Sequence, residues 1–433
     1  RTLLVTVGGG LALLAAVAIM MVTAGTASLS GVLASDIWQD PATSTVLAVL
    51  LALAAFTKSA QFPFQAWLPD SMVAISPVSA YLHAAAMVKA GVFLLLVFSP
   101  VLADHAVWST LLIACGLITA LFGAITALRQ HDLKGLLAYS TMSQLGLLTA
   151  VIGIGTPAAL TAAVVHTVAH ALFKSALFML IGIVDHEAGT RDLRVLAGRH
   201  VRMPVTGTAL TLAAVSMAGV PPLLGFVSKE GLLDAALGTP GPAWAAPVVT
   251  GAIALASVFT VAYSGRLVLG ALGTWGASPA GTAQPWESAR GEEVHEAGPA
   301  FWTMPVLAAV AGVVLGLAPQ ALDAPVSAAA QTVAGAQAHA HLALWHGVTP
   351  ALLLSAAVIA TGLVLVLLRR PVAAVTLVAA VTGVVVLAGA LPGGGAVLNP
   401  ASRALLAAQK QGKYEPLYDA LLKLRTEPTE AVI

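Results

Sequence analysis

The sequence predicts an all-α polytopic membrane protein, and its composition and hydropathy pattern carry this prediction. Of its 433 residues, 58% are hydrophobic and only 9% are charged, whereas a soluble domain carries about 25% charged residues. Apolar runs near the roughly 20 residues that span a bilayer recur along the chain. The 40 Gly and 24 Pro interrupt these runs, as is common in transmembrane helices. This composition excludes a soluble globular protein, a disordered chain and a nucleic-acid binder.

Apolar runs bounded by Gly, Pro or charge are expected to form spans or half-spans. They lie at 3–24, 43–60, 77–99, 106–128, 133–154, 158–184, 204–219, 225–238, 246–272, 301–318, 346–368 and 371–391. Two interruptions carry paired prolines, at 63–70 and at 219–225. Proline removes a backbone donor, and irregular backbone survives at membrane depth only beside protein or a water-filled cavity. Paired broken helices predict a transport site; ordinary kinked helices are the alternative.

The distribution of Lys and Arg predicts the orientation of the spans. If 204–238 is one broken span, the loops at 25–42, 100–105, 155–157, 239–245 and 319–345 share one side and hold no Lys or Arg. The opposite side is therefore expected to be cytoplasmic. It collects Arg129, Lys134, Arg191, Arg194, Arg199, Arg202, Arg290, Arg369 and Arg370. The basic segment 392–433 is expected to lie along the membrane surface as an amphipathic helix, with its side left open.

Lysine, rather than arginine, is the cation inside the predicted spans. Lys58, Lys89, Lys174 and Lys229 lie in apolar helices, and Lys134 stands at a helix start. A charge inside a membrane is costly and is a functional hypothesis by default. Arg cannot release its proton in a protein, whereas a buried Lys can. The pattern favours proton exchange; snorkelling to an interface is the alternative, and it suits Lys134 best.

Two histidines extend this pattern on one predicted helix. His166, His170 and Lys174 follow at i, i+4 and i+8 and therefore share a face. Steps of about 6 Å between such positions would allow a proton relay; structural histidines are the alternative. His83 and Lys89 share another helix but not one face, because six residues rotate the helix by about 600°. They are expected to serve different neighbours.

Polar side chains near these groups are candidates for lining water. Ser140, Thr141, Ser143 and Gln144 follow Lys134 in one span, and Glu230, which follows Lys229, is expected at a helix break or end. They could carry water between the lysines, or they could bond neighbouring helices. Lys58 has no acidic partner within a span, since Asp36 and Asp40 fall in a loop. Because a buried ammonium usually needs a partner, we expect a Glu or Asp upstream of Arg1 to supply it.

Motifs for cofactors and metals are weak in this sequence. No phosphate-binding loop and no dinucleotide fingerprint occur, and the single Cys115 excludes a disulfide framework and a cysteine-held cluster. We expect no cofactor. His339, His341 and His346 have metal-like spacing, but with only Asp323 nearby we expect no metal site. The acidic run Glu287, Glu292, Glu293 and Glu296 is expected to be a solvated loop.

Five segments resemble the antiporter-like subunits shared by Mrp-type multisubunit cation/proton antiporters and respiratory complex I. They are 56–70, 76–91, 132–146, 166–174 and 225–230. The resemblance covers about residues 1–370. Lys89 within Met-Val-Lys-Ala-Gly, and the run 182–192, resemble the large A-type component of the Mrp branch.

This resemblance implies an antiporter-like fold with inverted five-helix repeats and two broken transmembrane helices, which carry Lys58 and Lys229. The chain would be an internal fragment of a longer protein. Residues 1–99 would be the C-terminal part of the first repeat, and 100–272 the second repeat. Residues 273–391 would be peripheral helices, and 392–433 a connecting segment.

The same resemblance implies roles for single residues. Lys58 matches the lysine of the first half-channel, Lys174 the central lysine reached through His166 and His170, and Lys229 the terminal lysine. His83, Lys89 and Lys134 would complete the proton axis.

The implied function is a subunit of a Na⁺ (Li⁺, K⁺)/H⁺ antiporter in the bacterial cell membrane, and not an enzyme. Its partners would be the B- to G-type subunits and membrane lipid. A proton-pumping subunit of an NADH-quinone oxidoreductase or a membrane-bound hydrogenase is the alternative. A scaffold with a vestigial channel is a third possibility, which the intact Lys/His series disfavours.

Overall fold

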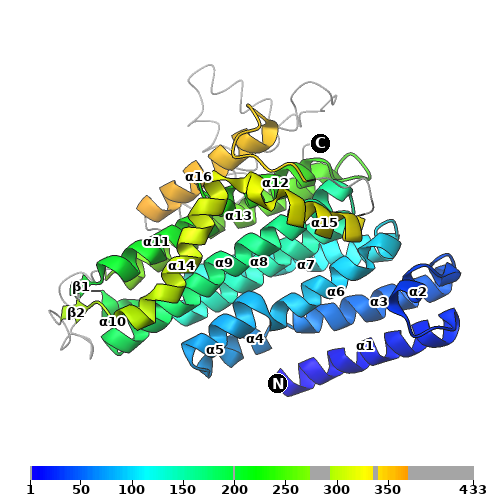
Figure 1. The fold of residues 1–433 in the computed structure, drawn as a ribbon, viewed down its shortest axis with the longest axis horizontal. Helices are drawn as coiled ribbons and strands as arrows, with labels where there is room; N and C mark the ends of the chain where they lie inside the picture. The colour runs from blue at the N-terminus through cyan, green and yellow to red at the C-terminus, as the bar shows by residue number, and fades with distance from the viewer. Residues whose placement is uncertain (1, 198–199, 274–292, 335–339, 369–433) are drawn as a thin grey trace, which may run out of the picture. The chain divides into compact units, whose positions relative to one another are not determined.

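The computed structural model describes residues 2–197, 200–273, 293–334 and 340–368, which belong to one compact unit (Figure 1). Nine of its helical segments are long and apolar enough to cross a membrane. They confirm the all-α polytopic prediction as far as residue 368. The span expected at 371–391 and the amphipathic segment 392–433 lie outside the described residues.

The long spans match the expected runs to within a few residues at most ends. They are α1 (Thr2–Ala24), α3 (Pro41–Lys58), α6 (Met87–Leu102) preceded by α5 (Ser76–Ala80), α7 (Ala106–Arg129), α8 (Leu133–Ile154), α9 (Pro157–Ala188), α13 (Ala245–Ala271), α14 (Pro299–Leu317) and α16 (Pro350–Leu368). The half-spans α11 (Pro204–Ala218) and α12 (Leu224–Leu237) form the second broken helix.

Shorter elements connect these helices. They are α2 (Leu29–Leu33), η1 (Asp36–Trp38), α4 (Trp67–Asp70), η2 (Ser71–Val73), η3 (Tyr81–Ala85), α10 (Leu193–Leu196), β1 (His200–Arg202), β2 (Glu293–His295), η5 (Pro319–Leu322) and α15 (Asp323–Ala334).

Side-chain caps fix where three of the spans begin. Asp40 accepts from the Thr43 amide at the start of α3, and Asp132 accepts from the Gly135 amide at the start of α8. Thr156 does the same for α9, and Pro157 follows it. These are the side chains that best satisfy the open N–H groups of a first turn, and proline fits the position after them.

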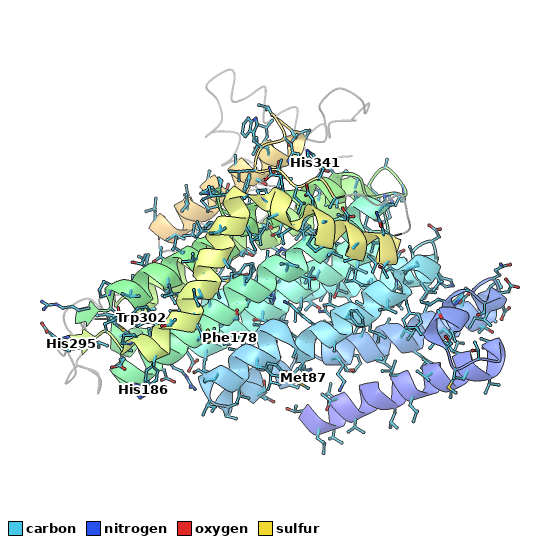
Figure 2. All side chains as sticks on the ribbon, in the orientation of Figure 1. Met87, Phe178, His186, His295, Trp302 and His341 are labelled. Atoms are coloured by element: carbon cyan, nitrogen blue, oxygen red, sulfur yellow. The ribbon has the colours of Figure 1, made fainter. Side chains whose placement is uncertain are left out.

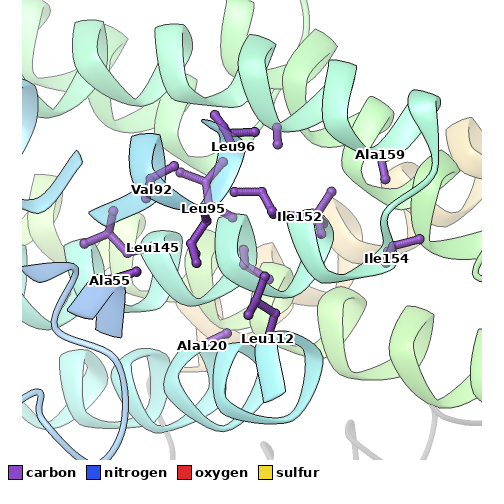
Figure 3. Close-up of a cluster of buried hydrophobic side chains, with 14 of the residues drawn as sticks. Ala55, Val92, Leu95, Leu96, Leu112, Ala120, Leu145, Ile152, Ile154 and Ala159 are labelled. Carbon is purple, nitrogen blue, oxygen red and sulfur yellow. The ribbon is translucent and has the colours of Figure 1, made fainter. Parts of the chain in front are cut away.

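Helix α8 lies in the interior, between α7 and α9 (Figure 1). Glycines bring α7 and α8 together, as is common between membrane helices. A Cβ on Gly146 would lie 2.4 Å from the Ala120 nitrogen, so only glycine permits this approach. Figure 3 shows the packed side chains beside it, including Leu112 of α7 and Leu145 of α8. The interior of the bundle is therefore close-packed and apolar, apart from the polar groups described below.

Both expected breaks are present. The first begins directly after Lys58, where the chain leaves α3 before α4. Neighbouring groups satisfy its irregular backbone: the Trp67 indole donates to the Thr57 carbonyl, and the Phe62 amide donates to Thr119. The second break separates α11 from α12, and Gly219 takes a positive φ of 82° there. Irregular backbone thus survives where protein receives it.

A third irregularity was not predicted. The run 77–99 was expected to be continuous, but a π-helical turn, η3, separates α5 from α6. This turn contains His83, and π-helical turns occur frequently at functional sites. Apolar periodicity carries no signal for one extra residue in a turn, which is why the sequence pattern missed it.

The acidic run was wrongly interpreted as a solvated loop where the structure describes it. Strand β2 pairs in parallel with β1, and the Glu293 carboxylate lies 3.3 Å from Arg202. Glu296 accepts from the backbone amides of Val205 and Thr206 at 2.7 and 3.2 Å. A carboxylate at a helix N-terminus is stabilising, so Glu296 fixes the start of α11. Glu287 and Glu292 lie outside the described residues.

Candidate functional site: a buried row of histidine and lysine

The centre of the site is one face of α9. His166, His170 and Lys174 are each fully buried. The ring centroids of His166 and His170 are 6.4 Å apart, and Phe173 packs edge-on against both rings. Both ring nitrogens of His170 lack a hydrogen-bond partner among the described residues. The spacing of i, i+4 and i+8 therefore places three buried titratable side chains along one face of α9.

Lys174 ends this row against α8. Its Nζ donates to the Ser140 hydroxyl at 2.5 Å and to the Leu137 carbonyl at 3.3 Å. Within the described part of the chain, no carboxylate forms an ion pair with Lys174. The partners of Lys174 are neutral, so no opposite charge in contact with the amine stabilises its protonated form.

His166 begins the row with hydrogen bonds on both ring nitrogens. Its Nε2 lies 3.1 Å from the Gln144 side-chain oxygen, and its Nδ1 lies 3.1 Å from the Ser228 hydroxyl. The Gln144 amide nitrogen donates to Tyr263 at 2.9 Å and to Thr260 at 3.2 Å. Helices α8, α12 and α13 therefore converge on this one ring.

The other intramembrane lysines bind backbone carbonyls. Lys89 donates to the Thr167 carbonyl of α9 at 2.9 Å. Lys134 donates to the carbonyl of Met72 in η2 at 3.3 Å and to that of Ala74, directly after η2, at 2.5 Å. Lys229 donates to the Ala218 carbonyl at 3.3 Å across the second break. The Ala218 carbonyl ends α11 and has no partner within that helix, so the second break supplies an acceptor for Lys229. The Thr167 carbonyl, by contrast, lies inside α9.

Gly219 makes the contact of Lys229 possible. A Cβ at position 219 would lie 2.6 Å from the Lys229 Cδ. The positive φ of Gly219 also favours glycine. The second break therefore both frees a carbonyl and leaves room for the lysine stem to reach it.

His83 lies apart from Lys89, as predicted. Its Nε2 is 3.2 Å from the Ser71 hydroxyl, and its ring packs against Trp67 and against Phe178 of α9. The side chain is fully buried. Both side chains reach α9, but His83 packs against Phe178 and Lys89 bonds the Thr167 carbonyl, so they have different neighbours.

Two of the candidate residues differ from expectation. Lys58 was expected to be buried within a helix, but it is the last residue of α3 and is partly exposed. The break begins directly after it, so its side chain stands at a helix end. Glu230 was placed at a helix break or end, yet it lies well inside α12, where it accepts from the Thr349 hydroxyl at 3.4 Å.

The polar residues of α8 have different roles in the structure. Ser140 and Gln144 bond directly to Lys174 and His166. Thr141 donates to the carbonyl of its own helix at Leu137. Ser143 is buried, and its hydroxyl has no partner among the described residues. Bonding between helices is thus seen for Ser140 and Gln144, and water lining stays a prediction.

Sequence reasoning missed three members of the site: Ser228, Thr260 and Tyr263. Ser228 directly precedes Lys229 on the second broken helix, which was a usable signal. Thr260 and Tyr263 lie three residues apart on α13, in an apolar run with no charge beside them. Nothing in that run points toward Gln144, so only the packing of α13 against α8 reveals them.

An ion-pair cluster fixes the end of α8 that carries Lys134. Arg191 bonds Asp132 through its Nε and lies 3.5 Å from Asp185. The hydrogen bond to Asp132 is the main cause that raises the pKa of Arg191. Arg191 also accepts from the Leu133 amide through its carbonyl, at 3.0 Å. Arg191 therefore binds the start of α8 through both its side chain and its backbone carbonyl.

Two cavities approach the buried row from different ends. One of about 660 Å³ is lined by Lys134, Asp185, His186 and Arg191 on the basic side. Another of about 520 Å³ is lined by Ser228, Glu230, Asp234, His341 and His346 on the side whose loops lack Lys and Arg. Figure 2 shows His186 well away from His341. The row thus lies between two cavities that are lined by titratable groups.

The histidine motif on the second side does not form a recognisable metal centre in the described chain. The rings of His341 and His346 lie 6.5 Å apart, and Asp323 is 3.9 Å from His341. No group of three or more His, Cys, Asp or Glu side chains among the described residues could hold a metal ion. His339 lies outside those residues.

Comparison with known proteins assigns the family. The model of the family "NADH:quinone oxidoreductase/Mrp antiporter, TM" matches residues 1–259. The chain belongs to this family. The resemblance found in the sequence motifs is therefore confirmed.

Curated relatives carry the names of antiporter components. The A-type Na⁺/H⁺ antiporter subunit of Alkalihalophilus pseudofirmus is 38% identical over 400 residues, which cover 86% of this chain and 48% of the relative. The probable K⁺/H⁺ antiporter subunit of A/B type from Rhizobium meliloti is 49% identical over 270 residues, which cover 62% of this chain and 27% of the relative. The chain spans about half the length, or less, of the curated relatives it matches.

Solved structures confirm the antiporter-like subunit fold. A chain of the Mrp complex from Dietzia sp. DQ12-45-1b is 46% identical with a TM-score of 0.75, covering all of this chain and 47% of that one. A chain of respiratory complex I from Thermus thermophilus has a TM-score of 0.63 at 24% identity; the match covers 77% of this chain and 68% of that one. At that identity the likeness concerns the fold alone. The residue ranges assigned to the inverted repeats stay a prediction.

Proposed function

We propose that the chain is part of the A-type subunit of an Mrp-type monovalent cation/proton antiporter in a bacterial cell membrane. In this proposal it moves protons along the row His166–His170–Lys174, and the assembled complex couples this movement to export of Na⁺, Li⁺ or K⁺. One observation carries the proposal: three titratable side chains lie in register and fully buried inside an otherwise apolar bundle. A charge in that position is costly and needs a functional reason.

The chemistry of the row favours protons over metal cations as its cargo. Lysine only donates hydrogen bonds, and hard cations such as Na⁺ take oxygen ligands. In the described chain, no carboxylate touches His166, His170 or Lys174. Imidazole and amine groups each bind and release one proton. The row therefore suits proton transfer, and the cation would take another path.

The remaining candidates extend the proposed path on both sides. Lys134 lines the cavity on the basic side, and Ser228, which directly precedes Lys229, lines the cavity on the opposite side; in this proposal Lys134 and His83 serve the cytoplasmic end of the path and Lys229 the other end. Lys58 and Lys89 would belong to the first half of the family's polar axis. These groups exchange protons without forming a covalent bond to a substrate, so we infer a component of a secondary transporter and not an enzyme.

The proposed partners are the other subunits of the complex, of B to G type, and membrane lipid. Helix α1 exposes a broad apolar surface: Leu4 and Val22 are 78% and 82% exposed. Apolar side chains exposed to this degree need lipid or another protein chain beside them. The relatives named above are themselves antiporter subunits.

A second candidate is a proton-pumping subunit of a respiratory complex. The observation that favours it is the fold shared with a chain of the archaeal membrane-bound sulfane sulfur reductase, 27% identical with a TM-score of 0.66. The subunits that co-purify with the complete protein separate the two candidates. Small Mrp-type subunits would support the antiporter, and iron–sulfur subunits would support the respiratory complex.

The transport experiment uses the complete complex in inside-out vesicles of an antiporter-deficient bacterium. A respiratory substrate acidifies the vesicles, and Na⁺, Li⁺ or K⁺ is then added. The antiporter proposal expects the pH gradient to fall on addition of at least one of these cations. A gradient that all three cations leave unchanged, with the complex present in the membrane, would contradict the proposal.

A further inference from the structure

A chain of hydrogen bonds fixes the protonation pattern of the His166 ring. Thr260 donates to the Ala256 carbonyl at 2.9 Å, and Tyr263 donates to Thr260 at 3.1 Å. Both hydroxyl hydrogens are thereby committed, so these oxygens accept from the Gln144 amide nitrogen. The Gln144 oxygen must then face His166. Because a carbonyl oxygen only accepts, His166 Nε2 carries a hydrogen in either charge state.

The second nitrogen, Nδ1, is therefore the atom that gains and loses the proton. It lies 3.1 Å from the Ser228 hydroxyl, which also lies 3.0 Å from the Gly225 carbonyl. One hydroxyl hydrogen cannot serve both acceptors. When the ring is neutral, Ser228 donates to Nδ1. When the ring is charged, Nδ1–H donates to Ser228, and the Ser228 hydrogen turns to Gly225. Rotation of one hydroxyl satisfies both states.

Ser228 also belongs to the wall of the cavity of about 520 Å³ on the outer side. The same cavity is lined by Glu230, Asp234, His341 and His346. Ser228 is 1% exposed, and His166 behind it is fully buried. Ser228 therefore separates the buried row from a cavity whose other polar groups can accept a proton.

We propose that Ser228 is the relay through which His166 exchanges its proton with this outer cavity. The proposal rests on the proposed function, because it places one end of the proton path. The Ser228 hydrogen first turns from the Gly225 carbonyl to a water molecule in the cavity, and it passes to that water as the Nδ1 proton passes to the Ser228 oxygen. The ring becomes neutral, and the hydrogen received from Nδ1 now joins Ser228 to that nitrogen. One proton leaves the imidazolium and one reaches the cavity, so the transfer balances.

The groups that act on His166 come from each helix around it. Lys229 on α12 and Lys89 on α6 are the lysines whose charges act on the ring. His170 follows on α9 itself, and α8 and α13 contribute the neutral Gln144 and Tyr263. Glu230, Asp234, His341 and His346 face the cavity beyond Ser228. Substituting Ser228 changes none of these charged groups.

The test compares Ser228→Ala with Ser228→Thr in the complete complex. The alanine variant loses the hydroxyl, and the threonine variant keeps it. Ser99→Ala is the matched control, because Ser99 is buried and its hydroxyl, among the described residues, bonds only the Leu95 carbonyl of its own helix. Antiport rates are measured across pH in H₂O and in D₂O. Infrared difference spectra with ring-labelled histidine follow the titration of His166. The bands of His166 are identified by their absence in His166→Ala.

The relay predicts that Ser228→Ala slows antiport by about tenfold or more, within the range for a positioned proton-transfer group. It also predicts an altered pH profile, isotope effect and His166 titration, all restored by Ser228→Thr and unaffected by Ser99→Ala. Wild-type rates and an unchanged His166 titration in Ser228→Ala would overturn the relay. A threonine variant as slow as the alanine variant would overturn it too. If the unmodified complex has no antiport activity, the proposed function fails, and the His166 titration still decides whether Ser228 is its proton partner.

Discussion

The Lys174 ammonium of α9 lies 2.5 Å from the Ser140 hydroxyl of α8, and both side chains are fully buried. Ser140 donates its own hydrogen to the Leu137 carbonyl at 2.9 Å, so its lone pairs face Lys174. A charged lysine and a neutral one can both keep this hydrogen bond. A carboxylate in the same place would favour only the charged form. The neutral partner therefore suits a lysine that is meant to gain and lose its proton.

The histidine row gives a test of connectivity. His166→Ala and His170→Ala each remove one step of the same path, so each should slow antiport severely. The double variant should cost no more than the slower single variant, because residues that act as a unit are non-additive. Rates are measured in vesicles over a wide pH range. Full activity of the double variant would mean that both histidines are structural.

The helix pair α7–α8 gives a test of the packing. Gly146→Ala should destabilise the protein by about 1–3 kcal/mol, the usual cost of overpacking, because its Cβ would lie 2.4 Å from the Ala120 nitrogen. Gly10→Ala is the control, since Gly10 lies in α1 with open space around it. That change should be neutral or slightly stabilising. Thermal unfolding in detergent measures both, and equal melting temperatures would contradict the close approach of the two helices.

The cap of α8 gives a test of what stabilises the helix end that carries Lys134. Asp132→Ala removes both the cap and the ion pair with Arg191, and should cost about 0.5–2 kcal/mol from the cap alone. Asp132→Asn keeps a capping side chain and loses only the charge. Because both partners of the ion pair are about 35–41% exposed, that loss should be under about 1 kcal/mol. Melting temperatures should therefore rank wild type, Asn and Ala in falling order. An asparagine variant as unstable as the alanine variant would show that the charge, and not the cap, dominates.

The spans and the core of the site followed from the sequence, because both rest on short-range periodicity. Apolar run length predicted each described span, and the i, i+4, i+8 spacing predicted that His166, His170 and Lys174 share a face. The paired prolines predicted both broken helices. These are local features, so no knowledge of the packing was needed.

The rest depended on contacts between helices that are distant in the sequence. Gln144 and Tyr263 meet only because α8 packs against α13, and Ser228 meets His166 only because α12 packs against α9. The partial exposure of Lys58 and the π-helical turn around His83 are also set by tertiary packing. The acidic partner expected for Lys58 stays a prediction.

The central claim is that Lys174 gains and loses a proton during transport, and the change Lys174→Arg tests it most directly. Arginine keeps a positive charge and hydrogen-bond donors at that position, but it cannot release its proton. Lys174→Ala is the reference for complete loss, and the amount of assembled complex is measured for each variant. Proton-coupled cation transport is then followed in inside-out vesicles. The account predicts that an assembled Lys174→Arg complex is nearly as inactive as Lys174→Ala; near-normal transport by the arginine variant would contradict it.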